Sequence, residues 1–231
     1  MTRIFFSLAL FALVLLGVNL TIGLTIGDYN SSVARWRDAV GEVRSLERQR
    51  PAPAADQLEA ARKAQDAATA ELTPRRDRVR LHWLFGLSAA LVTVLVNSVT
   101  VTYFIGTSRW CKEVCDAYSL NVELAARCAR LKKRTFPWCL TAILVVLGIV
   151  ALGAASEPGN SLVHDSASWV QFHFLAALGG LALIAFAFLV QANSLLANYR
   201  LIQEIMDQVR QIRTDRGLET ADATDAIATG A

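Results

Sequence analysis

The chain has 231 residues, of which 54% are hydrophobic and 19% are charged, and its net charge is +3 at pH 7. That hydrophobic share is higher than in an ordinary soluble domain. The small net charge and the scattered basic residues exclude a nucleic-acid-binding protein. No catalytic motif stands out, so we expect a protein that is not an enzyme.

Four uncharged apolar runs dominate the sequence. Each holds roughly 18–25 residues without Asp, Glu, Lys or Arg, which is the length that crosses a hydrocarbon core about 30 Å thick. The first run is longer than the apolar part of a signal peptide and has no good cleavage site after it. The pattern therefore predicts an all-α, four-span transmembrane helical bundle. The runs are 4–26, 81–105, 138–155 and 169–189.

Between and beyond the spans, the sequence predicts a helical hairpin and helical extensions of spans 2 and 4. In chain order the expected segments are span 1 (1–27), an extracytoplasmic helical hairpin (28–80), span 2 (81–106), a basic cytoplasmic helix (107–137), span 3 (138–155), a short extracytoplasmic loop (156–168), span 4 (169–193), a cytoplasmic heptad helix (194–216) and a disordered tail (217–231).

The charges outside the spans predict the orientation. The segment 107–137 carries seven basic residues against three acidic ones, and the loop 156–168 carries no Lys or Arg. Basic loops face the cytoplasm in most membrane proteins. We therefore expect a multi-pass protein of the inner (plasma) membrane with both termini in the cytoplasm.

The segment 28–73 has the pattern of two antiparallel helices joined at Pro51-Ala52-Pro53. Large apolar residues recur at heptad spacing in the first arm, and mostly small ones recur in the second, so the arms can pack closely. Thr73-Pro74 is expected to end the second arm. The hairpin is either a solvated spacer or a surface that binds a partner. The expected seam is Val33, Trp36, Val40 and Val43 against Leu58, Ala61, Ala64, Ala68 and Leu72.

On the other side of the membrane, 107–134 is expected to be a single helix that stops before Phe136-Pro137. A heptad pattern continues after span 4 through a polar segment, with an Asn at one core position. This helix either packs on the 107–134 helix of its own chain or forms a homodimer through 195–212. The heptad residues are Leu195, Asn198, Ile202, Ile205, Val209 and Ile212.

Four cysteines lie on the presumed cytoplasmic side: Cys111, Cys115, Cys128 and Cys139. The cytoplasm keeps thiols reduced, so structural disulfides are not expected there. On one straight helix Cys128 would lie about 20 Å beyond Cys115. The cysteines are therefore expected to be buried thiols and not a zinc site.

The three histidines are the sharpest chemical signal. His82 and His173 lie on the small or polar stripes of spans 2 and 4, and such stripes face other helices in a membrane. Ionisable groups that face the interior of a membrane bundle are candidates for function. The stripe residues are Gly86, Ala89, Thr93, Asn97 and Thr100 in span 2, and Ala177, Gly180, Ala187 and Gln191 in span 4.

Two interpretations of these histidines stay open. His82 and His173 could ligate a b-type haem, or the two with His164 could bind a copper or iron ion. Alternatively, they are interfacial side chains that bond the neighbouring backbone, Gln171 or Asp165.

Four polar residues inside the spans, Thr93, Asn97, Thr100 and Gln191, are predicted to bond between helices. Asn97 is expected to bond Asn19 or Thr141 on a neighbouring span.

The leading hypothesis from sequence is a non-enzymatic structural, accessory or signal-relaying component that contacts the bilayer and other membrane proteins or a second copy of itself. The alternative is a small haem- or metal-binding electron-transfer subunit that uses His82 and His173. A transporter or channel is disfavoured because no charged residue interrupts a span.

Overall fold

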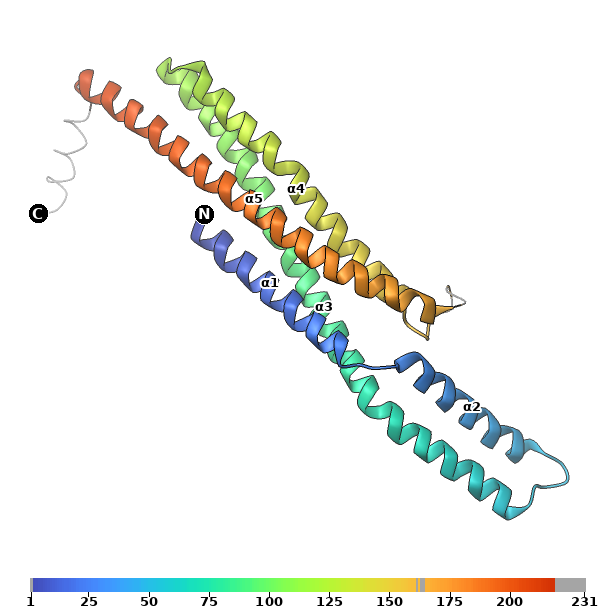
Figure 1. Ribbon diagram of the computed structural model, residues 1–231. Helices are drawn as coiled ribbons and strands as arrows, with labels where there is room; N and C mark the ends of the chain where they lie inside the picture. Colours follow the sequence, from blue (N-terminus) through green and yellow to red (C-terminus); the bar gives the residue numbers. More distant parts are fainter. Residues whose placement is uncertain (1, 161, 163–164, 219–231) are drawn as a thin grey trace, which may run out of the picture. The chain divides into compact units, whose positions relative to one another are not determined.

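A computed structural model describes residues 2–160, 162 and 165–218 of the chain. These residues form five α-helices and no strand (Figure 1). His164 and residues 219–231 of the predicted disordered tail lie outside the described residues. The helices are α1 (Thr2–Leu24), α2 (Tyr29–Arg48), α3 (Ala55–Tyr118), α4 (Val122–Ala155) and α5 (Ser166–Asp215).

Four of these helices, α1, α3, α4 and α5, are long and apolar enough to cross a membrane. A helix suits a bilayer because it bonds its own backbone polar groups where no water is available. The all-α class and the four apolar helices predicted from the sequence are therefore confirmed. They indicate an integral membrane protein.

The chain forms two compact units, and α1, α3, α4 and α5 each contribute to both. The first unit contains Met1–Ala9, Val94–Ile143 and Ile184–Ala231, and the second contains Leu10–Thr93 and Leu144–Leu183. The histidine site lies in the second unit, and the cysteines lie in the first.

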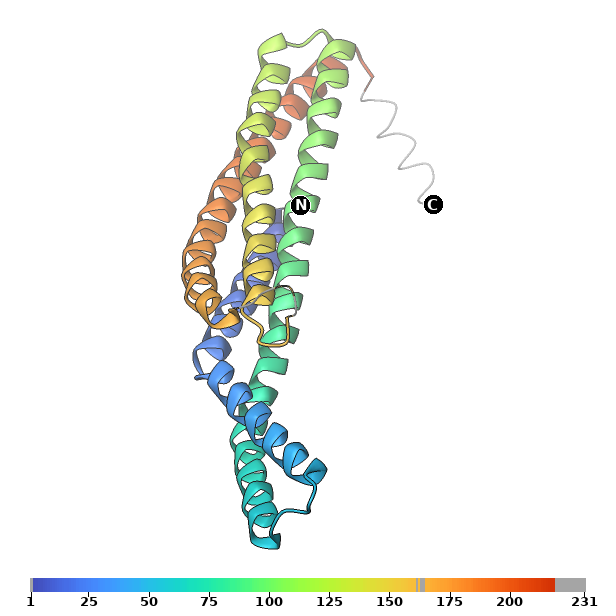
Figure 2. The ribbon, with the colours of Figure 1, turned by 90° about the vertical axis from the view of Figure 1, so that its right-hand side faces the viewer.

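In the second unit, α2 lies beside the first part of α3 and forms the predicted hairpin (Figures 1 and 2). Asp28 caps α2, since its side chain accepts a hydrogen bond from the Ser31 N–H at 3.1 Å. The capped helix then buries an apolar seam against α3.

The prediction for one seam residue is wrong, because Ala64 is exposed and Gln65 is half-buried in its place. The fully buried apolar seam residues are Val33, Val43, Ala61 and Leu72.

The second arm does not end at Thr73-Pro74 as predicted. Pro74 lies inside α3, which continues without a break into the apolar span. A proline removes one backbone bond from a helix, but the residues on both sides of Pro74 are held by α2. Glu71 pairs with Arg35, and Arg75 bonds the Ser32 hydroxyl. These contacts between the helices outweigh the local effect of the proline.

In the first unit, the predicted single helix over 107–134 is wrong. α3 ends at Tyr118, Ser119 has a positive φ of 53°, and α4 begins at Val122. The Asn121 side chain caps α4 by accepting a hydrogen bond from the Glu123 N–H at 2.9 Å. Asn is one of the best residues at this position, so a short turn reverses the chain (Figure 2).

The predicted stop before Phe136-Pro137 is also wrong, because α4 runs from Val122 to Ala155 with Pro137 inside it. The basic segment and the third span therefore share one helix.

The last part of α5 packs on α3 and α4 of its own chain, which confirms the first of the two alternatives for the heptad helix. Leu201, Ile205 and Val209 bury their side chains against the α3–α4 turn. Leu201 occupies the core position expected for Ile202, which is only half-buried. The partners in this cluster are Cys111, Cys115, Leu124 and Cys128.

Because the turn reverses the chain, Cys128 returns to Cys111, and the two form a disulfide. The expectation of four free thiols is therefore wrong for this pair, whereas Cys115 and Cys139 are free and buried. Burial raises the pKa of the Cys115 thiol, which keeps it protonated and unreactive.

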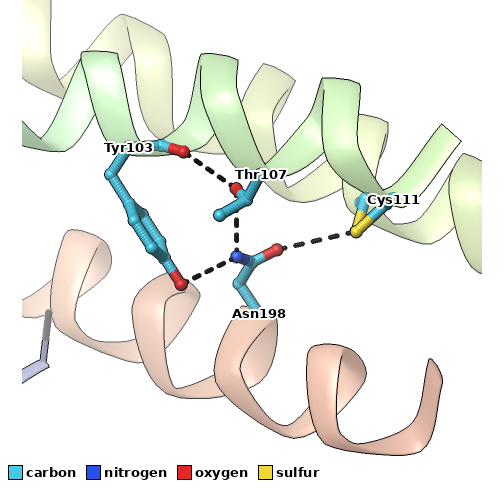
Figure 3. The surroundings of a disulfide bond; sticks show 5 residues. Tyr103, Thr107, Cys111 and Asn198 are labelled. Carbon is cyan, nitrogen blue, oxygen red and sulfur yellow. Dashed lines mark hydrogen bonds between the residues drawn. A yellow bond between two sulfur atoms is a disulfide. The ribbon is translucent and has the colours of Figure 1, made fainter. Parts of the chain in front are cut away.

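Asn198 of α5 links these helices beside the disulfide (Figure 3). Its Nδ2 donates to the Tyr103 hydroxyl at 3.0 Å and to the Thr107 hydroxyl at 3.2 Å. Its Oδ1 lies 3.7 Å from the Cys128 sulfur. Asn198 is fully buried, so the polar core position is satisfied by its own chain.

Replacement of Asn198 tests this network. Asn198→Ala should lower the free energy of unfolding by about 1–2 kcal/mol, because the half-buried hydroxyl groups of Tyr103 and Thr107 lose their partner. Denaturation in detergent, followed by helical circular dichroism, measures the change. Tyr199→Ala is the control, since Tyr199 is 52% exposed. Equal effects of the two variants would show that the network does not stabilise the fold.

Candidate functional site

The structure brings His82 of α3 and His173 of α5 together in the second unit. Their ring centroids are 6.0 Å apart and the ring planes meet at 84°. Both side chains are half-buried. The sequence pattern had placed the two at depths that differ by about 6 Å along the helix axis. In the folded chain the two rings make an edge-to-face contact.

Each imidazole bonds a backbone carbonyl of the helix beside it. His82 Nδ1 lies 3.1 Å from the Asn19 carbonyl oxygen of α1, and His173 Nδ1 lies 3.1 Å from the Ile149 carbonyl oxygen of α4. A carbonyl oxygen only accepts, so Nδ1 carries the proton and donates it. In the neutral ring this leaves the lone pair on Nε2. Both histidines therefore have a nitrogen available to bind a metal.

A glycine lies four residues after each acceptor residue, and its missing side chain leaves space for the imidazole ring. An added Cβ would lie 3.1 Å from the His82 Cε1 at Gly23 and 3.0 Å from the His173 Cε1 at Gly153. Such contacts are tight, so each ring would have to move by a few tenths of an ångström to admit a methyl group. The pairs α1–α3 and α4–α5 thus repeat one arrangement, which consists of a carbonyl, a glycine one helical turn later and an imidazole.

The two rings line a cavity of about 560 Å³. Ligand pockets in proteins have volumes of about 300–1,000 Å³ and mostly apolar walls. Most of the wall here is apolar, and the polar lining residues gather where α1 joins α2 and where α4 ends. The cavity therefore has an apolar body and one polar end. The polar-end residues are Asp28, Tyr29, Asn30, Ser31, Ser156 and Glu157; apolar wall residues include Leu16, Leu20, Val146, Val150, Phe174 and Leu181.

The surroundings at the polar end change the pKa values of Tyr29 and Asp28 in opposite directions. Burial raises the pKa of the Tyr29 phenol, and the Glu157 carboxylate raises it further. Tyr29 therefore stays neutral and can donate a hydrogen bond. The hydrogen bonds from Ser31 lower the pKa of Asp28, which stays ionised as the cap of α2.

A metal ion without a cofactor finds few ligands in this cavity. Among the residues that the structure describes, no group of three or more His, Cys, Asp or Glu could hold a metal ion. The third histidine of the copper or iron hypothesis, His164, lies outside these residues. The described part of the site offers two imidazole nitrogens.

The predicted interhelical polar residues are all fully buried. The structure gives Asn97 an interhelical partner that was not expected, since its Oδ1 accepts a hydrogen bond from the Gln191 Nε2 at 2.9 Å. This bond joins α3 to α5 in the first unit. Thr100 donates to the carbonyl of Val96 at 2.8 Å within α3. Thr93 is buried on the same helix.

Sequence reasoning missed the residues that hold the imidazoles: Asn19, Gly23, Ile149 and Gly153. The glycines left a weak signal, since each sits near the end of an apolar run that lacked a small or polar stripe of its own. The acceptors left none, because any residue can provide a backbone carbonyl. Comparison with protein-family models, with curated proteins and with solved structures finds no match.

The role of the glycine can be tested without a ligand. Gly153→Ala should push the His173 ring by a few tenths of an ångström, weaken its hydrogen bond to the Ile149 carbonyl and shift the ring's ¹⁵N NMR signals, because the new methyl group would lie 3.0 Å from Cε1. The weaker hydrogen bond should lower the free energy of unfolding by up to about 1 kcal/mol. Gly148→Ala is the matched control on α4, since no atom lies within 4 Å of its added Cβ. Unchanged imidazole signals in Gly153→Ala would contradict this account.

Proposed function

We propose that the chain is a small membrane haem protein in which His82 and His173 are the axial ligands of a b-type haem. The supporting observation is that the two rings, which line one cavity, are anchored in the same way through Nδ1, so that each neutral ring keeps a lone pair on Nε2. A haem iron held by both histidines would need the two rings close together. The observed separation of 6.0 Å fits that requirement.

The donor set favours haem over a metal ion alone. Zinc and copper sites in proteins take three or four side-chain donors, and the described residues offer two imidazoles. A porphyrin supplies four nitrogens of its own and needs only axial ligands. The apolar walls suit a porphyrin, and the glycines let the helices approach without side chains between them.

Two axial histidines favour electron transfer as the activity. His82 and His173 would together hold the iron and leave it no position for oxygen or a substrate, and the haem would then supply electron exchange. The bond from each Nδ1–H to a carbonyl makes the imidazole a stronger donor and fixes its orientation. We therefore propose an electron-carrying component with no substrate of its own.

A haem spectrum tests the proposal. The protein, purified from cells that supply haem, should show a Soret band and the EPR signal of low-spin iron with two histidine ligands. His82→Ala and His173→Ala should each lose that signal, and imidazole added to His173→Gly should restore it if the variant folds. His164→Ala is the control and should keep the spectrum. A colourless wild-type protein that also fails to bind added haem would refute the proposal.

A second candidate function is contact with another membrane protein, as the sequence suggested. It is favoured by the α2–α3 hairpin, whose apolar seam is buried while its charged residues are exposed. A homodimer through 195–212 has less support, because Leu201, Ile205 and Val209 already pack on α3 and α4. An electron-carrying subunit needs a partner, so the two functions are compatible.

We also propose that the α3–α4 turn and both termini face the cytoplasm of a cell whose inner membrane holds the protein. The basic residues near the turn support this orientation. The Cys111–Cys128 disulfide argues against it, since such bonds persist in oxidising compartments. The test must therefore avoid the native cysteines.

Site-directed labelling decides between these arguments. In a chain with all four cysteines replaced by serine, Leu162→Cys should react with a membrane-impermeant maleimide on intact cells, and Arg216→Cys should not. Leu162 is 89% exposed, and Arg216 is exposed just beyond the end of α5. Labelling of Arg216→Cys alone would reverse the orientation.

A further inference from the structure

A second hollow of about 580 Å³ adjoins the histidine cavity on the face of α3. We call it the arginine groove, because Arg76 and Arg80 lie in its wall. The groove and the cavity share lining residues from three segments of the chain. The shared residues are Tyr29, Val79, Trp83, Leu87 and Glu157.

The four arginines between positions 75 and 80 divide into two pairs. Arg75 bonds Glu71 and Ser32, and Arg78 donates to the Thr25 carbonyl at 2.7 Å, so these two hold the hairpin to the spans. Arg76 and Arg80 form no ion pair with any residue that the structure describes. They are the guanidinium groups left for a ligand.

The groove has a net positive charge. Glu157 is the one carboxylate among its lining residues, against two guanidinium groups. Arg76 and Arg80 are four residues apart on α3, so they lie on one face of the helix. They precede His82 by about 9 Å and about 3 Å of helix rise. They also lie about 120° (Arg76) and about 160° (Arg80) around α3 from His82, so they border the cavity only through the lining residues that it shares with the groove.

We infer that the arginine groove binds the carboxylates of the ligand whose apolar body occupies the histidine cavity. The inference rests on the proposed function, in which those carboxylates are the two haem propionates. The guanidinium fork matches a carboxylate with two parallel hydrogen bonds. Arg76 and Arg80 thus fix the direction in which the ligand enters, with its charged edge at the groove and its apolar edge between the spans.

Paired variants and paired ligands test this inference. Haem b and iron protoporphyrin IX dimethyl ester differ only in whether the two carboxylates are free. Arg76→Gln with Arg80→Gln should weaken binding of haem b by about tenfold or more and leave binding of the ester unchanged. Soret titration of the full chain in detergent measures both affinities. Arg44→Gln with Lys63→Gln is the matched control, since both residues are exposed on the hairpin and unpaired with described residues.

The possible failures are distinguishable. If the wild-type protein binds neither porphyrin, the proposed function and this inference both fall. If haem b and its ester bind the wild-type protein equally well, only this inference falls. If the arginine variant loses a co-purified anionic phospholipid in native mass spectrometry and keeps its haem affinity, the groove binds a lipid phosphate, and the assignment to propionates is overturned.

Discussion

Helices in a bilayer associate through close contact and polar bonds, because hydrocarbon gives them no hydrophobic reason to meet. In the second unit these contacts are the two imidazole–carbonyl bonds, each made possible by a glycine. In the first unit they are the bonds of Asn97 with Gln191 and of Asn198 with Tyr103 and Thr107. Both units thus depend on a few directed bonds between helices.

The bonds that position His82 and His173 also determine their chemistry. A histidine that only joins two helices and one that binds a metal both use an Nδ1–H to carbonyl bond, because that bond fixes the ring and its tautomer. The structural interpretation of these residues, which expected a backbone partner, is therefore compatible with ligand binding. The cavity that both rings line makes the difference, since a purely structural pair needs no space of 560 Å³ beside it.

The sequence predicted the features that depend on the composition of a whole segment. The four apolar helices follow from uncharged runs long enough for a bilayer, and the hairpin follows from two apolar seams around Pro51 and Pro53. Helical phase predicted that His82 and His173 face other helices, since both lie on small or polar stripes. In each case many residues carry the signal.

The errors concern places where one local signal competes with tertiary contacts. Pro74 and Pro137 were taken as helix ends, but both lie within helices. The turn at Ser119–Asn121 was missed because it holds neither Gly nor Pro, and the chain reverses there through the φ of Ser119 and the cap of Asn121. Without that reversal, Cys128 could not reach Cys111. One missed turn therefore also accounts for the missed disulfide.

The repetition of the histidine arrangement argues that it serves more than stability. Glycine inside a helix costs about 0.5–1 kcal/mol relative to alanine, and a half-buried imidazole has been removed from much of its water. One such contact would be an ordinary packing solution. Two of them, on separate helix pairs with the glycine at the same offset, direct their rings into one cavity. A bundle needing only close contact could use alanine and leucine there, so the two imidazoles that line the cavity, each with a lone pair on Nε2 in its neutral form, are the part of the arrangement that stability does not explain.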